Sequence, residues 1–155
     1  MTFSESINTC FRQKYATFSG RASRSEYWWF TLAYWLILIV SVVLVLLVGG
    51  GLQYFAGANG STNDGPPVLV IIFMVLAAIL FLAMLLPSIA VLIRRFHDVG
   101  ISGWWYLAII VVGMVPVIGT LIQFAPLVIA LLKGTDGPNK YGPDPKNGGE
   151  AEIFA

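Results

Sequence analysis

The chain has 155 residues, of which 57% are hydrophobic and 11% are charged, and this composition excludes an ordinary soluble domain, which carries about 25% charged residues. Its formal net charge of +1 excludes the broad basic surface of a nucleic-acid-binding protein. The single cysteine, Cys10, and the single histidine, His97, exclude a disulfide framework and a multi-cysteine or histidine-cluster metal site, so we expect no metal and no cofactor.

Residues 1–19 are predicted to form an amphipathic helical segment. Thr2 and Glu5 have the spacing of a capping box, and apolar residues recur at near-helical intervals as far as Phe18. Such a segment either lies among lipid headgroups or docks on the rest of the protein, and the pattern favours neither. Cys10, on the apolar face, is expected to be a small buried hydrophobic residue.

Three long apolar stretches contain no Asp, Glu, Lys or Arg: residues 27–48, 68–93 and 104–132. Each is longer than the roughly 20 residues that cross the hydrocarbon of a bilayer. They predict an all-α integral membrane protein, a small helical bundle forming a single membrane domain. The first two stretches are expected to be full transmembrane helices, joined by a Gly-rich external loop over residues 49–67.

The third stretch is too long for a simple crossing. As one helix, residues 104–132 would rise about 43 Å, whereas the hydrocarbon is roughly 30 Å thick. Pro116 lies near its centre between Gly113 and Gly119, and proline removes a helical hydrogen bond while glycine eases a reversal. The segment is therefore either a helical hairpin or one long kinked helix.

The basic residues predict the orientation. None of the nine Lys and Arg residues lies in the 49–67 loop, and cytoplasmic loops are enriched in them. We therefore expect the N-terminus and the 94–103 loop in the cytoplasm and residues 49–67 outside. A hairpin over residues 104–132 would return the polar tail, residues 133–155, to the cytoplasm with all nine basic residues on one side, so we favour the hairpin.

Three polar cassettes adjoin the apolar stretches. Residues 20–28 read GRxxRxEYW, residues 94–105 read RRxHDxGxSGWW, and residues 134–145 read GTxGxNxYGPDP. In these motifs and their order, over about residues 11–146, the chain resembles the domain-of-unknown-function 805 family of small bacterial inner-membrane proteins. The resemblance implies a multi-pass protein of the bacterial cytoplasmic membrane and no known activity.

The cassettes supply the candidate site, because the first two lie at one membrane face and a hairpin adds the third. The candidate residues are Arg21, Arg24, Glu26, Arg94, Arg95, His97, Asp98, Trp104, Asn139 and Tyr141. One interpretation is a structural clasp, in which Glu26 and Asp98 pair with arginines. The other is a binding site for an anionic lipid headgroup or an acidic partner segment.

We expect a non-enzymatic membrane module that binds a lipid headgroup or a partner protein, which includes a second copy of itself. An accessory or oligomeric subunit of a transporter or channel is the alternative, although the apolar stretches lack the ionisable residues that ion pathways contain. A membrane enzyme acting on lipid-linked substrates is third. His97 and Asp98 are adjacent, so on a helix they point about 100° apart and form no automatic relay.

Overall fold

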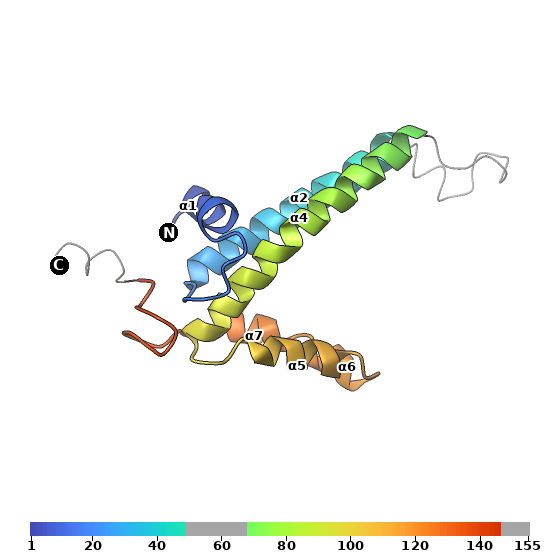
Figure 1. The fold of residues 1–155 in the computed structure, drawn as a ribbon. Helices are drawn as coiled ribbons and strands as arrows, with labels where there is room; N and C mark the ends of the chain where they lie inside the picture. The colour runs from blue at the N-terminus through green and yellow to red at the C-terminus, as the bar shows by residue number, and fades with distance from the viewer. Residues whose placement is uncertain (49–67, 147–155) are drawn as a thin grey trace. The chain divides into compact units, whose positions relative to one another are not determined.

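The computed structural model of the protein describes residues 1–48 and 68–146. All secondary-structure elements assigned in these residues are helices. Figure 1 shows the elements in chain order: α1 (Phe3–Asn8), the π-helix η1 (Thr9–Gln13), α2 (Arg24–Val48), α4 (Val68–Asp98), α5 (Trp104–Gly113), α6 (Ile118–Ile122) and α7 (Ala125–Leu131). The predicted all-α architecture is therefore confirmed for the described residues. The predicted external loop, residues 49–67, and residues 147–155 of the tail lie outside them.

The chain divides into two compact units. The first consists of Met1–Thr31 and Leu86–Ala155, and the second of Leu32–Leu85. Helices α2 and α4 pass through both units, so each unit contains part of each helix. Every Lys and Arg of the chain, and every Asp and Glu among the described residues, belongs to the first unit.

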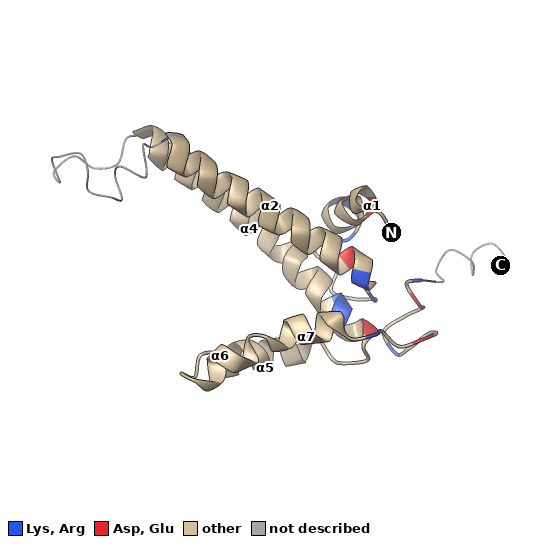
Figure 2. Cartoon of the chain, turned by 180° about the vertical axis from the view of Figure 1, so that it is seen from behind, with Lys and Arg blue, Asp and Glu red and all other residues tan. Residues whose placement is uncertain are grey.

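The second unit pairs the apolar lengths of α2 and α4, which lie side by side (Figures 1 and 2). The ring centroids of Tyr34 and Phe81 are 6.4 Å apart across this pair. Both helices are long and apolar enough to cross a membrane, yet only 11% and 6% of the residues in their apolar stretches are buried. A core helix of a soluble protein would bury most of them, so this exposure matches surfaces that face lipid.

Both long helices extend into the polar cassettes. Helix α2 begins before the predicted residue 27 because Ser23 caps it: the Glu26 backbone N–H donates to Ser23 Oγ at 3.2 Å. Helix α4 continues past the predicted residue 93 and ends in a glycine cap, with Gly100 at φ +84°. There the backbone N–H of Ile101 donates to the Phe96 carbonyl and that of Gly100 to the His97 carbonyl, as in a Schellman motif.

The third apolar stretch doubles back on itself. The backbone reverses between α5 and α6, where Val117 has a positive φ of 70°, a strained conformation for a β-branched residue. A Cβ atom on Gly119 would lie 2.1 Å from the Gly113 carbonyl oxygen, so only glycine allows the two arms this close. Gly103, before α5, and Ala130, near the end of α7, both contact the last turns of α4. The segment is thus a hairpin of short helices rather than one long kinked helix.

The N-terminal segment docks on the start of α2. The predicted capping box is confirmed: Thr2 N–H donates to Glu5 Oε2 at 2.8 Å and Glu5 N–H to Thr2 Oγ1 at 3.4 Å. Cys10 is fully buried, as expected, and Phe11 packs on Phe30 with ring centroids 5.6 Å apart. Helical structure ends at Gln13 instead of extending to residue 19.

Candidate functional site

The three polar cassettes meet in the first unit, where α2 begins, α4 ends and the tail passes both. Figure 2 shows the red and blue positions gathered at this end, while the apolar lengths of the helices are tan. Five charged side chains are buried here: Arg21, Glu26, Arg94, Arg95 and Asp98. We refer to these five residues as the clasp.

Asp98 is the acidic centre of one half of the clasp. Its Oδ1 accepts a hydrogen bond from Arg21 Nε at 2.9 Å, and its Oδ2 accepts one from Arg95 Nη1. The carboxylate thus neutralises two guanidinium groups, one from the first cassette and one from the second. Charge-assisted forks of this kind are among the stronger hydrogen bonds in proteins.

Glu26 and Arg94 form the other half of the clasp. Arg94 Nη1 donates to Glu26 Oε1 at 2.5 Å, and both side chains are almost fully buried. Cys10 lies against this pair, with its Sγ 3.9 Å from Glu26 Oε1 and 3.8 Å from Arg94 Nη2. Burial, followed by the charge of Glu26, raises the pKa of the Cys10 thiol to about 11, so this cysteine stays protonated at neutral pH.

The clasp arginines also hold the backbone of the hairpin end and the tail. Arg21 donates to the carbonyls of Thr135 and Gly137, each at 2.5 Å. Arg95 donates to the carbonyl of Ala130, at 3.3 Å, and to that of Leu132. The bonds of Arg95 thereby join α4 to backbone that lies 35 and 37 residues further along the chain, as the clasp interpretation requires.

The geometry argues against a lipid site made of these arginines. Arg94 and Arg95 have no exposed surface and Arg21 is 5% exposed, so a headgroup could reach them only by displacing buried ion pairs. Arg24 is exposed, with its Nε donating to the Leu132 carbonyl at 3.0 Å. Of the four arginines among the candidate residues, three therefore belong to the clasp.

The third cassette packs on His97 at the end of α4. The Tyr141 ring stacks on the imidazole, with centroids 4.0 Å apart and planes 5° apart. Asn139 Nδ2 donates to the His97 carbonyl at 3.0 Å and to Thr135 Oγ1 at 2.9 Å. His97 Nδ1 lies 3.2 Å from the Gly20 carbonyl oxygen rather than on a carboxylate, so His97 and Asp98 form no relay.

Asp144 stabilises the turn of the tail. Its Oδ1 accepts from the Lys146 backbone N–H at 2.9 Å and its Oδ2 from the Gly137 backbone N–H at 3.2 Å. These hydrogen bonds lower the pKa of the Asp144 carboxyl, and the bond from Lys146 has the largest effect. They do so because they favour the charged form of the carboxyl. The carboxylate is therefore a structural acceptor in the third cassette.

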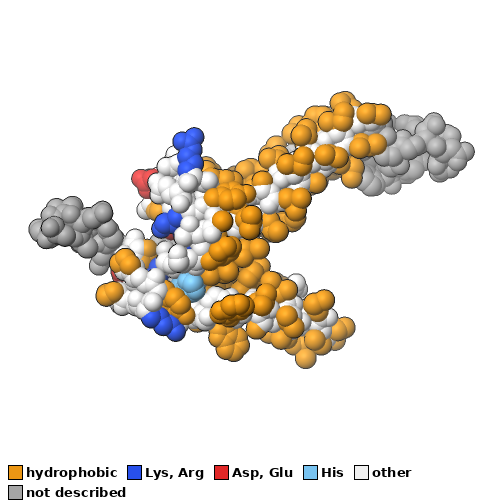
Figure 3. Space-filling view, in the orientation of Figure 1, with side chains coloured by type: hydrophobic (Ala, Val, Ile, Leu, Met, Phe, Trp, Pro, Cys, Tyr) orange, Lys and Arg blue, Asp and Glu red, His pale blue; other side chains and the backbone are white. Residues whose placement is uncertain are grey.

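Beside the clasp lies an apolar cleft with a volume of about 550 Å³, which we call the His97 cleft. Its apolar walls include Ile89, Ile93, Trp104, Tyr106, Leu107 and Ile110. His97, Ser102 and Tyr141 also line it. In Figure 3 the pale-blue histidine is visible at the surface among orange side chains. The volume lies within the roughly 300–1,000 Å³ typical of small-molecule sites.

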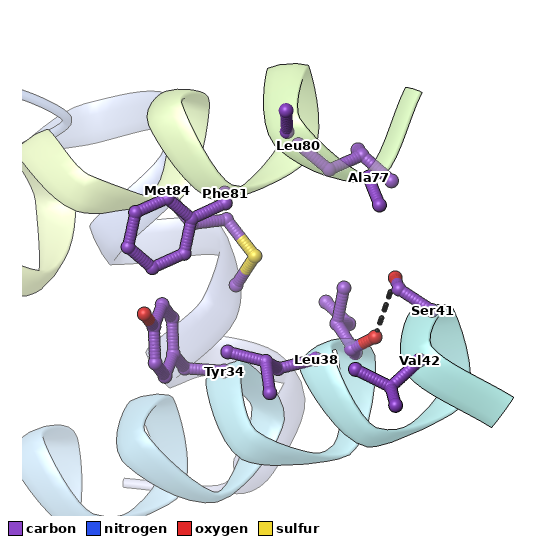
Figure 4. A pocket seen from close by; sticks show the side chains of 10 residues that line it. Tyr34, Leu38, Ser41, Val42, Ala77, Leu80, Phe81 and Met84 are labelled. Atoms are coloured by element: carbon purple, nitrogen blue, oxygen red, sulfur yellow. Dashed lines mark hydrogen bonds between the residues drawn. The ribbon is translucent and has the colours of Figure 1, made fainter. Parts of the chain in front are cut away.

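A second cavity, of about 320 Å³, lies between α2 and α4 in the second unit. Figure 4 shows its lining of apolar side chains from both helices, including Leu38 and Phe81. The hydroxyl of Ser41 donates a hydrogen bond to the Ile37 carbonyl at 2.7 Å. The hydroxyl proton therefore has its acceptor within the same helix. Small residues such as Ala77 also line this cavity.

Comparisons with known proteins identify the family. The family model described as "Protein of unknown function (DUF805)" matches residues 15–143. The chain belongs to the DUF805 family. It is 37% identical to the inner membrane protein YhaI of Escherichia coli (strain K12) over 136 residues, which cover 88% of this chain and 92% of that one. It is 44% identical to the inner membrane protein YhaH of the same strain over 61 residues, 39% of this chain and 45% of that one. No solved structure matches the chain.

Membership of the DUF805 family confirms the predicted family resemblance and the predicted class of bacterial inner-membrane protein. The matched range contains all three cassettes apart from the last residues of the third. The relatives' names assign them to the inner membrane and to no activity. Within the described residues of this DUF805 chain, no group of three or more His, Cys, Asp or Glu side chains could hold a metal ion.

The structure brings nine of the ten candidate residues to the clasp and the tail that packs on it, and it separates one. Trp104 is 77% exposed and borders the His97 cleft without entering the hydrogen-bond network. Sequence reasoning missed Thr135, whose N–H and hydroxyl both donate to the Asp98 carbonyl, at 2.8 and 3.0 Å. It also missed Gly134, where a Cβ would lie 2.0 Å from Asp98 Oδ2. Their only signal was their place in the third DUF805 motif.

Proposed function

We propose that the protein is a non-enzymatic module of the bacterial inner membrane that binds one lipid-like amphiphile in the His97 cleft. The observation that carries this proposal is the cleft itself: a largely apolar groove of about 550 Å³ that is also lined by the polar side chains of His97, Ser102 and Tyr141. An acyl chain gains about 0.8 kcal/mol for each buried methylene, so a groove of this kind suits the upper part of a lipid chain with its headgroup at the polar residues.

The clasp supports a binding role over a catalytic one. Both carboxylate oxygens of Asp98 accept hydrogen bonds from arginines. A catalytic histidine of the triad type has its Nδ1 on a carboxylate, whereas His97 has its Nδ1 on the Gly20 carbonyl. The described residues around the cleft instead build a fixed wall, which is what a binding site requires.

We place the clasp and both termini on the cytoplasmic side, with the hairpin of α5, α6 and α7 as a re-entrant element. The support is the distribution of the nine Lys and Arg residues, none of which lies in residues 49–67. Helix α5, Trp104–Gly113, is 10 residues long, about 15 Å at 1.5 Å per residue, which is too short for a full crossing. Non-helical backbone at its turn is tolerated in a membrane only where protein or water covers it.

Cysteine labelling in intact cells tests this orientation. In a Cys10→Ser background, a membrane-impermeant maleimide should label a cysteine placed within residues 49–67 and should not label Lys146→Cys until the cells are permeabilised. Labelling of Lys146→Cys in intact cells would contradict the cytoplasmic tail.

Native mass spectrometry of the purified chain tests lipid binding. We expect wild type to retain one lipid per chain and Leu107→Trp, which fills the His97 cleft, to lose it. Val111→Trp is the matched control, because Val111 lies on the same helix, is 61% exposed and does not line this cleft. Equal lipid retention by wild type and both variants would exclude the His97 cleft as the site.

A subunit of a larger membrane assembly is the second candidate. It is favoured by the groove between α2 and α4, where Ser41, Ala77 and Ala78 provide the small side chains that let another helix approach closely. Substituting Ala77→Leu and Ala78→Leu together should dissociate such an assembly, measured as the mass of the complex in mild detergent. An unchanged mass would leave the single-chain lipid module as the better proposal.

A further inference from the structure

The His97 side chain is held in one orientation and one tautomer. Its Nδ1 lies 3.2 Å from the Gly20 carbonyl oxygen, and a carbonyl oxygen only accepts, so Nδ1 carries a proton. The stacked ring of Tyr141, 4.0 Å away and nearly parallel, prevents the imidazole from turning. In a neutral imidazole with Nδ1 protonated, Nε2 is an unprotonated acceptor.

That acceptor is open to the His97 cleft. None of the described residues donates a hydrogen bond to Nε2, and the nearby Gly103 has no side chain to cover it. A Cβ atom at position 103 would lie 3.3 Å from Nε2 and 2.6 Å from Ile93 Cγ2. The glycine therefore leaves Nε2 uncovered on the side of residue 103, which lines the largely apolar cleft together with His97.

We propose that the ligand is an anionic phospholipid whose headgroup carries a free hydroxyl, and that His97 Nε2 accepts the hydrogen bond of that hydroxyl. This inference rests on the proposed lipid-binding function and adds the headgroup chemistry. The negative charge of the ligand is inferred from Lys140, whose Nζ lies 4.9 Å from the centroid of the Tyr141 ring. A cation beside the His97–Tyr141 stack favours a phosphate without a compensating ammonium group.

A comparison of lipids that differ only in the hydroxyl tests the headgroup. The full chain is purified in detergent, mixed with equal amounts of phosphatidylglycerol and phosphatidylpropanol, and measured by native mass spectrometry. The two lipids have the same charge and similar size, but only phosphatidylglycerol has hydroxyl groups. We expect about a tenfold preference for phosphatidylglycerol, the upper range of what one net hydrogen bond contributes. Excess free glycerol should not displace the lipid, because glycerol lacks the chain that fills the cleft.

Two variants assign the preference to its residues. His97→Asn keeps an N–H donor for the Gly20 carbonyl and has no atom at the Nε2 position, so the preference for phosphatidylglycerol over phosphatidylpropanol should disappear. Lys140→Gln should keep that preference and reduce the preference for phosphatidylglycerol over phosphatidylethanolamine. Ser41→Ala, in the other cavity, is the control and should change neither ratio.

The outcomes separate this inference from the proposed function. If wild type retains no lipid, the lipid-binding function fails. If wild type retains both lipids equally, or if His97→Asn keeps the hydroxyl preference, the role of Nε2 is refuted while lipid binding stands. Should His97→Asn fail to fold, the comparison of the two lipids on wild type still decides whether the hydroxyl is recognised. Displacement of the lipid by glycerol alone would identify a soluble polyol as the ligand and overturn the proposal.

Discussion

Replacing Asp98 by asparagine tests the clasp most directly. The substitution keeps the shape of the side chain and one oxygen acceptor, but it removes the charge that neutralises both Arg21 and Arg95. Both guanidinium groups are almost fully buried, so neither can be hydrated by a small movement. Breaking a buried ion pair on one side costs about 3–5 kcal/mol, and the amide NH₂ group of asparagine would add a repulsive contact with one arginine.

Thermal unfolding in mild detergent, followed by far-UV circular dichroism, measures this loss. A change of that size in a chain of 155 residues corresponds to a fall in Tm of roughly 10 °C. The matched control is Asp136→Asn, which removes the acidic member of the exposed pair with Lys133, 2.7 Å apart with both side chains more than half exposed. Exposed ion pairs contribute little, so the control should melt like wild type. Equal Tm values for Asp98→Asn and Asp136→Asn would refute the clasp as a source of stability.

Two further predictions concern the surroundings of the clasp. Gly134→Ala should lower the Tm because its Cβ would lie 2.0 Å from Asp98 Oδ2, whereas Gly113→Ala, with nothing within 4 Å of its Cβ, should leave the Tm unchanged; similar Tm values would contradict the close approach. With its pKa raised from 9.0 to about 11, Cys10 should react with iodoacetamide at pH 8 at least about 100-fold more slowly in the folded protein than in denaturing SDS. The same shift means that the folded state holds more protons between pH 9 and 11, so the free energy of unfolding should fall as the pH rises through that range; a flat profile there would count against it.

The sequence predicted that the cassettes meet at one membrane face, and it offered the pairing of Glu26 and Asp98 with arginines as one of two interpretations, because buried or interfacial charges need partners. It could not assign the partners. Arg94 and Arg95 are adjacent, and neighbouring side chains on a helix point about 100° apart, so one reaches Glu26 and the other Asp98. Which is which depends on how α2 and α4 are rotated about their axes.

The backbone carbonyls that accept hydrogen bonds from the clasp arginines could not be predicted from the sequence either, for a different reason. A carbonyl oxygen is present at every residue, so nothing in the pattern distinguishes Thr135 or Gly137, the acceptors of Arg21, from their neighbours. The His97 cleft has the same origin, since it exists only where α5 returns against the end of α4. Long helices and polar motifs are local properties of the chain, whereas a cleft is a property of how distant segments close on one another.

The clasp and the His97 cleft depend on the same segment of the tail. Arg21 links Asp98 to the Thr135 and Gly137 carbonyls, and the tail then continues through Asn139 to Tyr141, one wall of the cleft and the partner that stacks on His97. If the ion pairs opened, the tail would lose its anchor and the imidazole would lose the ring that fixes it. A buried network is a costly way to gain stability alone, but it is an effective way to fix the position of a binding wall. The clasp therefore has a role even if its arginines touch no ligand: it sets the geometry of the cleft beside it.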